Sequence, residues 1–194
     1  MSEVWAREND LVLRLATAAD FDSEAVRRAL RDNVERNYDG ELPPLPDGIA
    51  CYAIEAGGAL VGVIGFRRGV PRSRTGIGHA GNGEAVTIDL LAIAPGERGH
   101  AYGTRALLLV EARLAREGVV EGYARVPRGN GHGMYFMLRC GYAPIREGAA
   151  DGLGGAEDAW GAGVTWFRRN PALAPHGHAP RARGQRTASP PPQR

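Results

Sequence analysis

The chain has 194 residues, of which 43% are hydrophobic and 24% charged, and these values suit one folded domain with some additional sequence. All 24 basic residues are arginine, so a P-loop lysine, a Schiff-base lysine and a lysine nucleophile are excluded. The net charge is +2, but residues 171–194 carry four arginines and no acid, so the basic character belongs to this tail.

A strand is predicted at 11–15, followed by a helix that starts near Thr17. Asp20 follows Thr17 by three residues, as in a capping box, and apolar residues then recur at helical spacing. The next expected elements are an acidic loop at 38–48, interrupted by three prolines, and a hairpin at 49–66 that turns at Gly57 and Gly58.

The second half of the chain alternates strands and helices. This order, with an antiparallel N-terminal hairpin and a C-terminal βαβ unit, predicts an α/β fold with a mixed sheet and helices on both faces. The expected elements are a Gly- and Arg-rich loop at 67–83, a strand at 84–93, a helix at 102–117, a strand at 119–126, a short helix within 127–145 that stops at Gly141, a loop at 146–163 and a strand at 164–169.

A glycine-rich turn separates the strand at 84–93 from the following helix, an arrangement that often cradles phosphate. Its glycines are Gly96, Gly99 and Gly103, and this spacing does not match the G-x-G-x-x-G pattern of dinucleotide-binding proteins. A Walker A loop is also excluded, because it needs a lysine.

The turn instead carries Arg98, Ala101 and Gly103 in the pattern R-x-x-A-x-G, after the strand end "LLAIAP". A helix, a strand, Asn130 and the pair Gly141-Tyr142 follow in order. Together these features resemble the GCN5-related N-acetyltransferase (GNAT) family over roughly residues 10–168. The resemblance implies a GNAT-like domain at 1–170 that uses acetyl-CoA as co-substrate, without a metal. Residues 171–194 are Pro- and Arg-rich and are expected to be a disordered tail.

The physical chemistry of the turn agrees with a site for the CoA pyrophosphate. Backbone N–H groups at a helix N-terminus attract anions, small residues let the backbone approach, and Arg98 could add a charged hydrogen bond. Ala101 stands where the family usually has glycine, so it must tolerate that backbone angle. By resemblance, Leu91–Ile93 splay from the neighbouring strand to bind the pantetheine arm, and the Ile93 N–H donates to the thioester oxyanion. The expected cofactor-binding residues are Leu91, Ile93, Arg98, Gly99, His100, Ala101, Tyr102, Gly103, Thr104 and Asn130, the last with helix capping as its alternative.

Two residues are candidates for acid–base chemistry. Asp89 lies mid-strand, on the face predicted for Leu91 and Ile93 by simple alternation, and is the candidate general base; an ordinary surface acid is the alternative. Glu84 is a second candidate base. Tyr135 is the candidate general acid, although the family's tyrosine position is Met137 here, and a core or surface aromatic is the alternative.

The acceptor expected from this resemblance is a primary amine of a small molecule or a protein. An acidic segment after the first helix favours a cationic amine, whereas the Arg-rich stretch at 67–74 points toward CoA phosphates or an acidic partner. A non-catalytic acyl-CoA-binding module on the same fold stays open as the alternative function. Nucleic-acid binding through the tail is not favoured, and a homodimer is left open.

The location expected for this protein is the cytoplasm of a bacterium. The N-terminus lacks the apolar run of a signal peptide, and no segment approaches the ~20 apolar residues of a membrane span. Cys51 and Cys140 are expected to be free, buried thiols, since they lie far apart and have no metal-ligand spacing.

Overall fold

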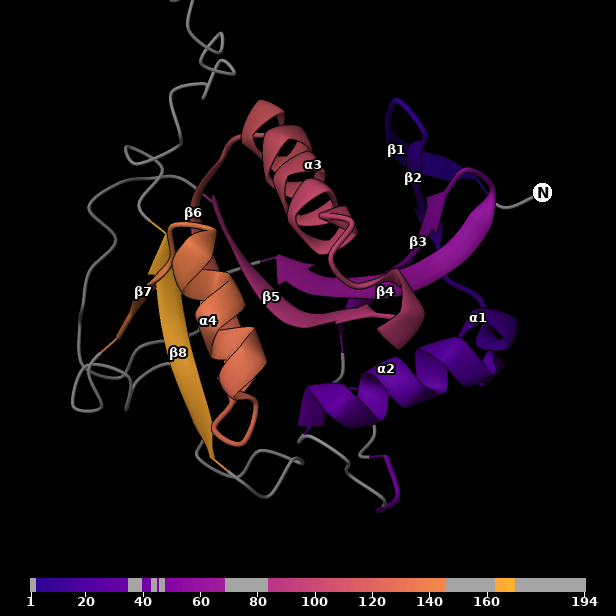
Figure 1. Cartoon of the computed structure of the whole chain (residues 1–194). Helices are drawn as coiled ribbons and strands as arrows, with labels where there is room; N and C mark the ends of the chain where they lie inside the picture. Colours follow the sequence, from indigo (N-terminus) through magenta and orange to yellow (C-terminus); the bar gives the residue numbers. More distant parts are fainter. Residues whose placement is uncertain are drawn as a thin grey trace, which may run out of the picture.

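The computed structural model describes residues 3–34, 40–42, 45, 48–68, 84–145 and 163–169. These residues form one eight-stranded mixed sheet in the order β1-β2-β3-β4-β5-β6-β8-β7, with helices on both faces (Figure 1). The α/β fold predicted from the sequence is therefore confirmed. The elements are β1 (Val4–Glu8), β2 (Leu11–Leu15), α1 (Ala18–Asp22), α2 (Glu24–Val34), β3 (Ala50–Ala56), β4 (Ala59–Arg68), β5 (Glu84–Ile93), η1 (Pro95–Glu97), α3 (Tyr102–Arg116), β6 (Val119–Pro127), α4 (Gly131–Arg139), β7 (Ala143–Pro144) and β8 (Val164–Arg169).

The first five strands form an antiparallel meander. The predicted hairpin is β3 and β4, and its turn residues Gly57 and Gly58 have φ angles of 57° and 84°, which suit glycine at both positions. Strand β1, which pairs with β2 at the edge of the sheet, was not expected from the sequence. The C-terminal βαβ unit is β5, α3 and β6, and its two strands are parallel, as predicted.

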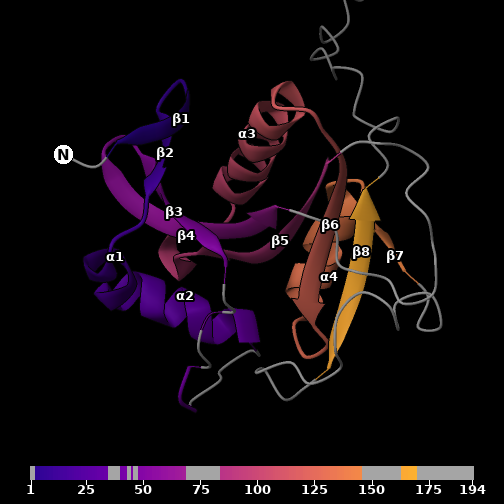
Figure 2. The ribbon, with the colours of Figure 1, turned by 180° about the vertical axis from the view of Figure 1, so that it is seen from behind.

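Two separate apolar cores hold the helices against the sheet. The larger contains Leu107, Val110 and Leu114 of α3 and includes Met137 of α4. The smaller lies on the other face and packs Val26, Ala29 and Leu30 of α2 against β4 and β5. Figures 1 and 2 show α2 and α3 on opposite sides of the sheet, so the helical layers are as the sequence predicted.

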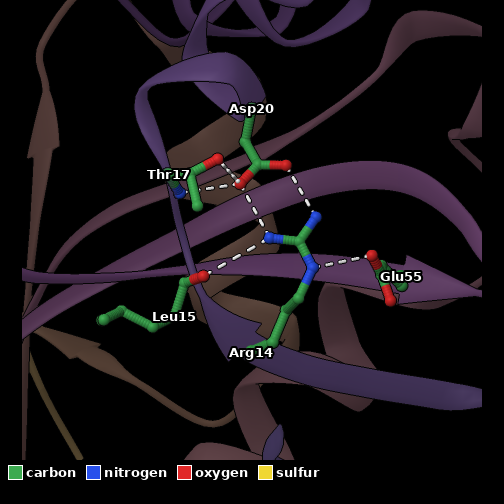
Figure 3. A network of polar contacts seen from close by, with 5 residues as sticks. All are labelled: Arg14, Leu15, Thr17, Asp20 and Glu55. Carbon is green, nitrogen blue, oxygen red and sulfur yellow. Dashed lines mark hydrogen bonds and ion pairs between the residues drawn. The ribbon is translucent and has the colours of Figure 1, made fainter. Parts of the chain in front are cut away.

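A polar network ties α1 to the sheet near the start of the chain (Figure 3). Thr17 and Asp20 form the predicted capping box. Helix α1 then ends at Asp22, with Ser23 as its C-cap, so the single helix expected here is split into α1 and α2. Arg14 of β2 donates to both carboxylate oxygens of Asp20 at 2.7 Å and to Glu55 of β3 at 2.8 Å. These hydrogen bonds from Arg14 outweigh the effect of burial and hold the pKa of the Asp20 carboxyl well below its usual value.

Several regions expected from the sequence lie outside the described residues. These are most of the acidic loop at 38–48, the Arg-rich loop beyond Arg68, the loop at 146–162 and the tail at 171–194. Within the described part of the chain, no helix is long and apolar enough to cross a membrane.

Candidate active site

Strands β5 and β6 separate part-way along their length and leave a cleft between them. They pair in parallel only from Glu84 to Ile88 of β5, whereas β5 stays paired with β4 through Ile93 and β6 stays paired with β8 through Pro127. Figure 2 shows the two strands running apart beyond this point. A cleft of about 840 Å³ lies at the separation, lined by both strands, by one side of α2 along its length and by the first turns of α3 and α4.

The separated end of β5 presents backbone groups to this cleft. The N–H of Ala94 donates to the carbonyl of Val61 in β4 at 2.9 Å. In an antiparallel ladder, hydrogen-bonded residues alternate with residues whose N–H and C=O point the other way. Ile93 and Leu91 pair with Gly62 and Ile64 in β4, so their backbone groups are directed away from β4 and toward the cleft.

A β-bulge at Asp89 changes the face that each residue of β5 presents. The pairing shifts by one residue between Gly65 and Phe66 of β4, opposite Leu90 and Ile88. Ile88 belongs to the core beneath α3, and Leu91 and Ile93 pack against that core, whereas Leu90 belongs to the core beneath α2. The prediction that Asp89 shares a face with Leu91 and Ile93 by simple alternation is therefore wrong.

Asp89 is enclosed by two arginines at the point where the strands separate. Its side chain has no exposed surface; its oxygens lie 2.7 Å and 2.9 Å from Arg67 Nε and Nη2, and Oδ1 lies 3.3 Å from Arg125 Nε. Burying a carboxylate is costly without such partners. The two guanidinium groups therefore hold Asp89 as a paired anion in the wall of the cleft.

The turn before α3 has the backbone form that its sequence pattern requires. After η1, Gly99 has φ 88°, and Ala101, at the N-cap of α3, has φ 61° and ψ 10°. Ala101 thus occupies the left-handed region that glycine favours, as its place in the motif predicted. The first intrahelical hydrogen bond runs from the Arg105 N–H to the Ala101 carbonyl at 2.9 Å, so the N–H groups of Tyr102, Gly103 and Thr104 lie at the open end of the helix.

The sequence profile of the acetyltransferase (GNAT) family matches residues 10–142, which include both separated strands and the turn before α3. The chain belongs to this family. A search of curated proteins finds no match.

Solved structures of several acetyltransferases share this fold. An acetyltransferase from Thermus thermophilus is 21% identical, with a TM-score of 0.52 over 82% of this chain and 96% of that one. The PaiA N-acetyltransferase of Thermoplasma acidophilum in complex with coenzyme A is 14% identical, with a TM-score of 0.52 over 82% and 98%. RimL, a ribosomal L7/L12 alpha-N-protein acetyltransferase, is 15% identical, with a TM-score of 0.58 over 88% and 95%.

In this GNAT domain, Arg98 joins the turn before α3 to the end of α2. Its Nε donates to the carbonyl of Ile93 at 3.1 Å, and its Nη2 lies 2.9 Å from Oδ2 of Asp32. The Arg98 side chain is 47% exposed. Asp32 also lines the cleft, and from the sequence it stood out only as part of a general acidic region. The contact between them joins residues 66 positions apart, so no local pattern could have revealed it.

Asn130 caps α4 and anchors it to α2. Its side-chain oxygen accepts a hydrogen bond from the Gly133 N–H at 2.7 Å, and its Nδ2 donates to the carbonyl and side-chain oxygens of Asn33 at 3.0 Å and 3.2 Å. From the sequence, Asn130 had two alternative roles, contact with the cofactor and capping of a helix. The structure has the capping interaction, and the side-chain amide nitrogen is directed to α2.

Tyr135 does not line the cleft. The residue is 62% exposed, and the centroid of its ring lies 5.9 Å from the guanidinium carbon of Arg139. Met137, at the position where the family usually has tyrosine, is buried and lines the cleft instead. The alternative of a surface aromatic therefore describes Tyr135 better than the predicted general acid does.

The tyrosine of the Gly141-Tyr142 pair belongs to the core. Tyr142 is 2% exposed and donates to Glu111 of α3 at 2.7 Å, and Arg169 of β8 pairs with the same carboxylate. Burial raises the pKa of Glu111, against the opposing effect of these two partners. Through Glu111, Tyr142 of the signature pair and Arg169 of β8 are both held to α3, which stabilises the fold.

His132 is the remaining titratable side chain of α4 in the lining of the cleft. The side chain of Glu84, the second candidate base, lies outside the described part of the structure. Among the described residues, no group of three or more His, Cys, Asp or Glu side chains could hold a metal ion.

Proposed function

We propose that the chain is an acetyl-CoA-dependent N-acetyltransferase that moves an acetyl group to a primary amine of a small molecule or a protein. The observation that carries this proposal is the separation of β5 from β6 beyond Ile88, directly beside a helix N-terminus with an open, left-handed turn. Family membership supports the same reaction, and the PaiA structure with the same fold is a complex with coenzyme A.

In this proposal the donor lies along the separated end of β5. The pantetheine arm hydrogen bonds to the backbone of Leu91 and Ile93, in place of the missing strand neighbour. The pyrophosphate lies over residues 98–104, where small residues and helix N–H groups stabilise its charge. The Ile93 N–H, directed into the cleft, donates to the oxyanion that forms when the amine attacks the thioester carbonyl.

The chemistry needs a neutral amine and a stable leaving group. The neutral amine nitrogen forms a bond to the acetyl carbon and loses one proton to water, the carbon–sulfur bond breaks, and the sulfur leaves as CoA thiolate. An alkyl ammonium resembles lysine, with a pKa near ~10, so its proton must pass to water or to a base before attack. A thiol is more acidic, with a pKa near ~8.5, so the thiolate can leave without being protonated or can take a proton from water.

Asp89 enters this mechanism as a positioning residue. Its carboxylate is enclosed by Arg67 and Arg125, so it has no exposed surface with which to accept a proton from the acceptor. Its pairing instead fixes the two strands where they separate, which sets the width of the cleft. Tyr135 is not assigned a catalytic role, because it lies outside the cleft lining.

The test is a screen in which free CoA thiol is detected during incubation with acetyl-CoA and polyamines, aminoglycosides, amino acids or peptide N-termini. We expect thiol release that depends on one class of amine. The enclosure of Asp89 and the exposure of Tyr135 also suit a non-catalytic acyl-CoA-binding module. Tight CoA binding without amine-dependent thiol release across the panel would favour that alternative.

A further inference from the structure

Asp32 is a carboxylate of the cleft whose charge is neutralised by the turn before α3. It lies near the end of α2, and its side chain is 25% exposed. Its Oδ2 lies 2.9 Å from Nη2 of Arg98, whose side chain is 47% exposed. Ion pairs that are open to solvent in this way are weak, so a stronger anion can displace one partner.

The cleft as a whole changes its charge balance when a donor enters. Among the residues that the structure describes, four arginines and three carboxylates line it, so these side chains carry a small excess of positive charge, which suits CoA phosphates. A bound pyrophosphate reverses that excess. Guanidinium groups pair with phosphate through two parallel hydrogen bonds, which gives Arg98 a better partner than a single contact with Asp32.

We propose that binding of acetyl-CoA draws Arg98 onto the pyrophosphate and leaves Asp32 as a free carboxylate that binds a cationic acceptor amine. This inference rests on the proposed function. Asp89, the buried carboxylate of the cleft, is already paired with Arg67 and Arg125. Glu24, the third carboxylate among the described lining residues, lies at the opposite end of α2 from Asp32. Asp32 is therefore the acceptor-binding acid that the donor itself makes available.

The first test measures CoA affinity by calorimetry at a fixed salt concentration. Asp32→Asn should bind CoA about two- to five-fold more tightly than the wild type, because Arg98 no longer has to leave an ion pair of ordinary surface strength. Glu24→Gln is the matched control, since it removes one negative charge from the same helix without touching Arg98. In an Arg98→Gln background, Asp32→Asn should tighten binding no more than Glu24→Gln does.

The second test measures steady-state kinetics with a cationic amine from the screen. Asp32→Asn should raise KM for the amine at least five-fold, with kcat within about two-fold of the wild type. Equal effects of Asp32→Asn and Glu24→Gln on CoA affinity, or an unchanged amine KM, would overturn the inference while leaving the proposed function intact. A wild-type chain that binds no CoA would instead overturn the proposed function.

Discussion

Asp89→Asn separates a positioning role from general-base catalysis. The substitution leaves two guanidinium groups facing a neutral amide, one on Arg125, whose side chain is 8% exposed, and one on Arg67, at 36%. Removing one partner of a buried ion pair costs about 3–5 kcal/mol. Since Arg67 is partly solvated, we expect a loss near the lower end of that range, measured by urea unfolding.

The control for this variant is Asp22→Asn. Asp22 pairs with Arg27 at 2.8 Å, but its side chain is 69% exposed, so its removal should cost at most about 1 kcal/mol. If Asp89 is a positioning residue, the Asp89→Asn enzyme should also keep the shape of the wild-type pH–rate profile at a lower rate. Two results together would refute this reasoning and restore Asp89 as the base: an Asp89→Asn variant that is as stable as the wild type, and a pH–rate profile of that variant that lacks the acidic limb of the wild-type profile.

Three further predictions concern the turn, the N-terminal network and a buried thiol. Ala101→Gly should raise the free energy of unfolding by about 0.5–1 kcal/mol in urea, because the relief of the left-handed alanine exceeds the extra entropy that glycine gives the unfolded chain. A lower free energy of unfolding would contradict backbone strain at Ala101. The pKa of Asp20 is lowered in the fold, so its carboxylate stabilises the protein fully above the unfolded carboxyl pKa of about 4 and loses this effect as the pH falls. The melting temperature of Asp20→Asn should therefore depend less on pH between about pH 5 and 2 than that of the wild type, and parallel plots of melting temperature against pH would contradict the network. Burial, and to a smaller degree the negative charge of Asp89, raises the pKa of Cys51 to about 11. Alkylation of Cys51 near pH 8 should therefore be at least about ten-fold slower in the folded protein than in the urea-unfolded chain, and equal rates would place the thiol in solvent.

Features written in short stretches of sequence were predicted well. The capping box at Thr17 and Asp20, the hairpin at Gly57 and Gly58 and the left-handed Ala101 all depend on a few adjacent residues. The family motif added the correct order of strands and helices around the turn. Local patterns of this kind are sufficient for element type and for the place of the turn before α3.

Features that depend on distant partners were not predictable. The bulge at Asp89 arises where β5 pairs with β4, and the partners of Asp89 come from β4 and β6. Simple alternation therefore placed its side chain on the wrong face. The contact between Arg98 and Asp32 likewise exists only after α2 has packed beside the turn. Strand β1 was missed because its residues are mostly exposed and carry no strong apolar alternation.

The central claim is that acetyl-CoA binds where β5 and β6 separate. The most direct test is a titration of the labelled chain with acetyl-CoA, followed by backbone amide NMR. The account predicts the largest shifts at Leu91, Ile93 and residues 99–104, with smaller changes at β1 and β2, which lie far along the sheet. Shifts concentrated away from the separated strands, or no shifts at saturating acetyl-CoA, would contradict it.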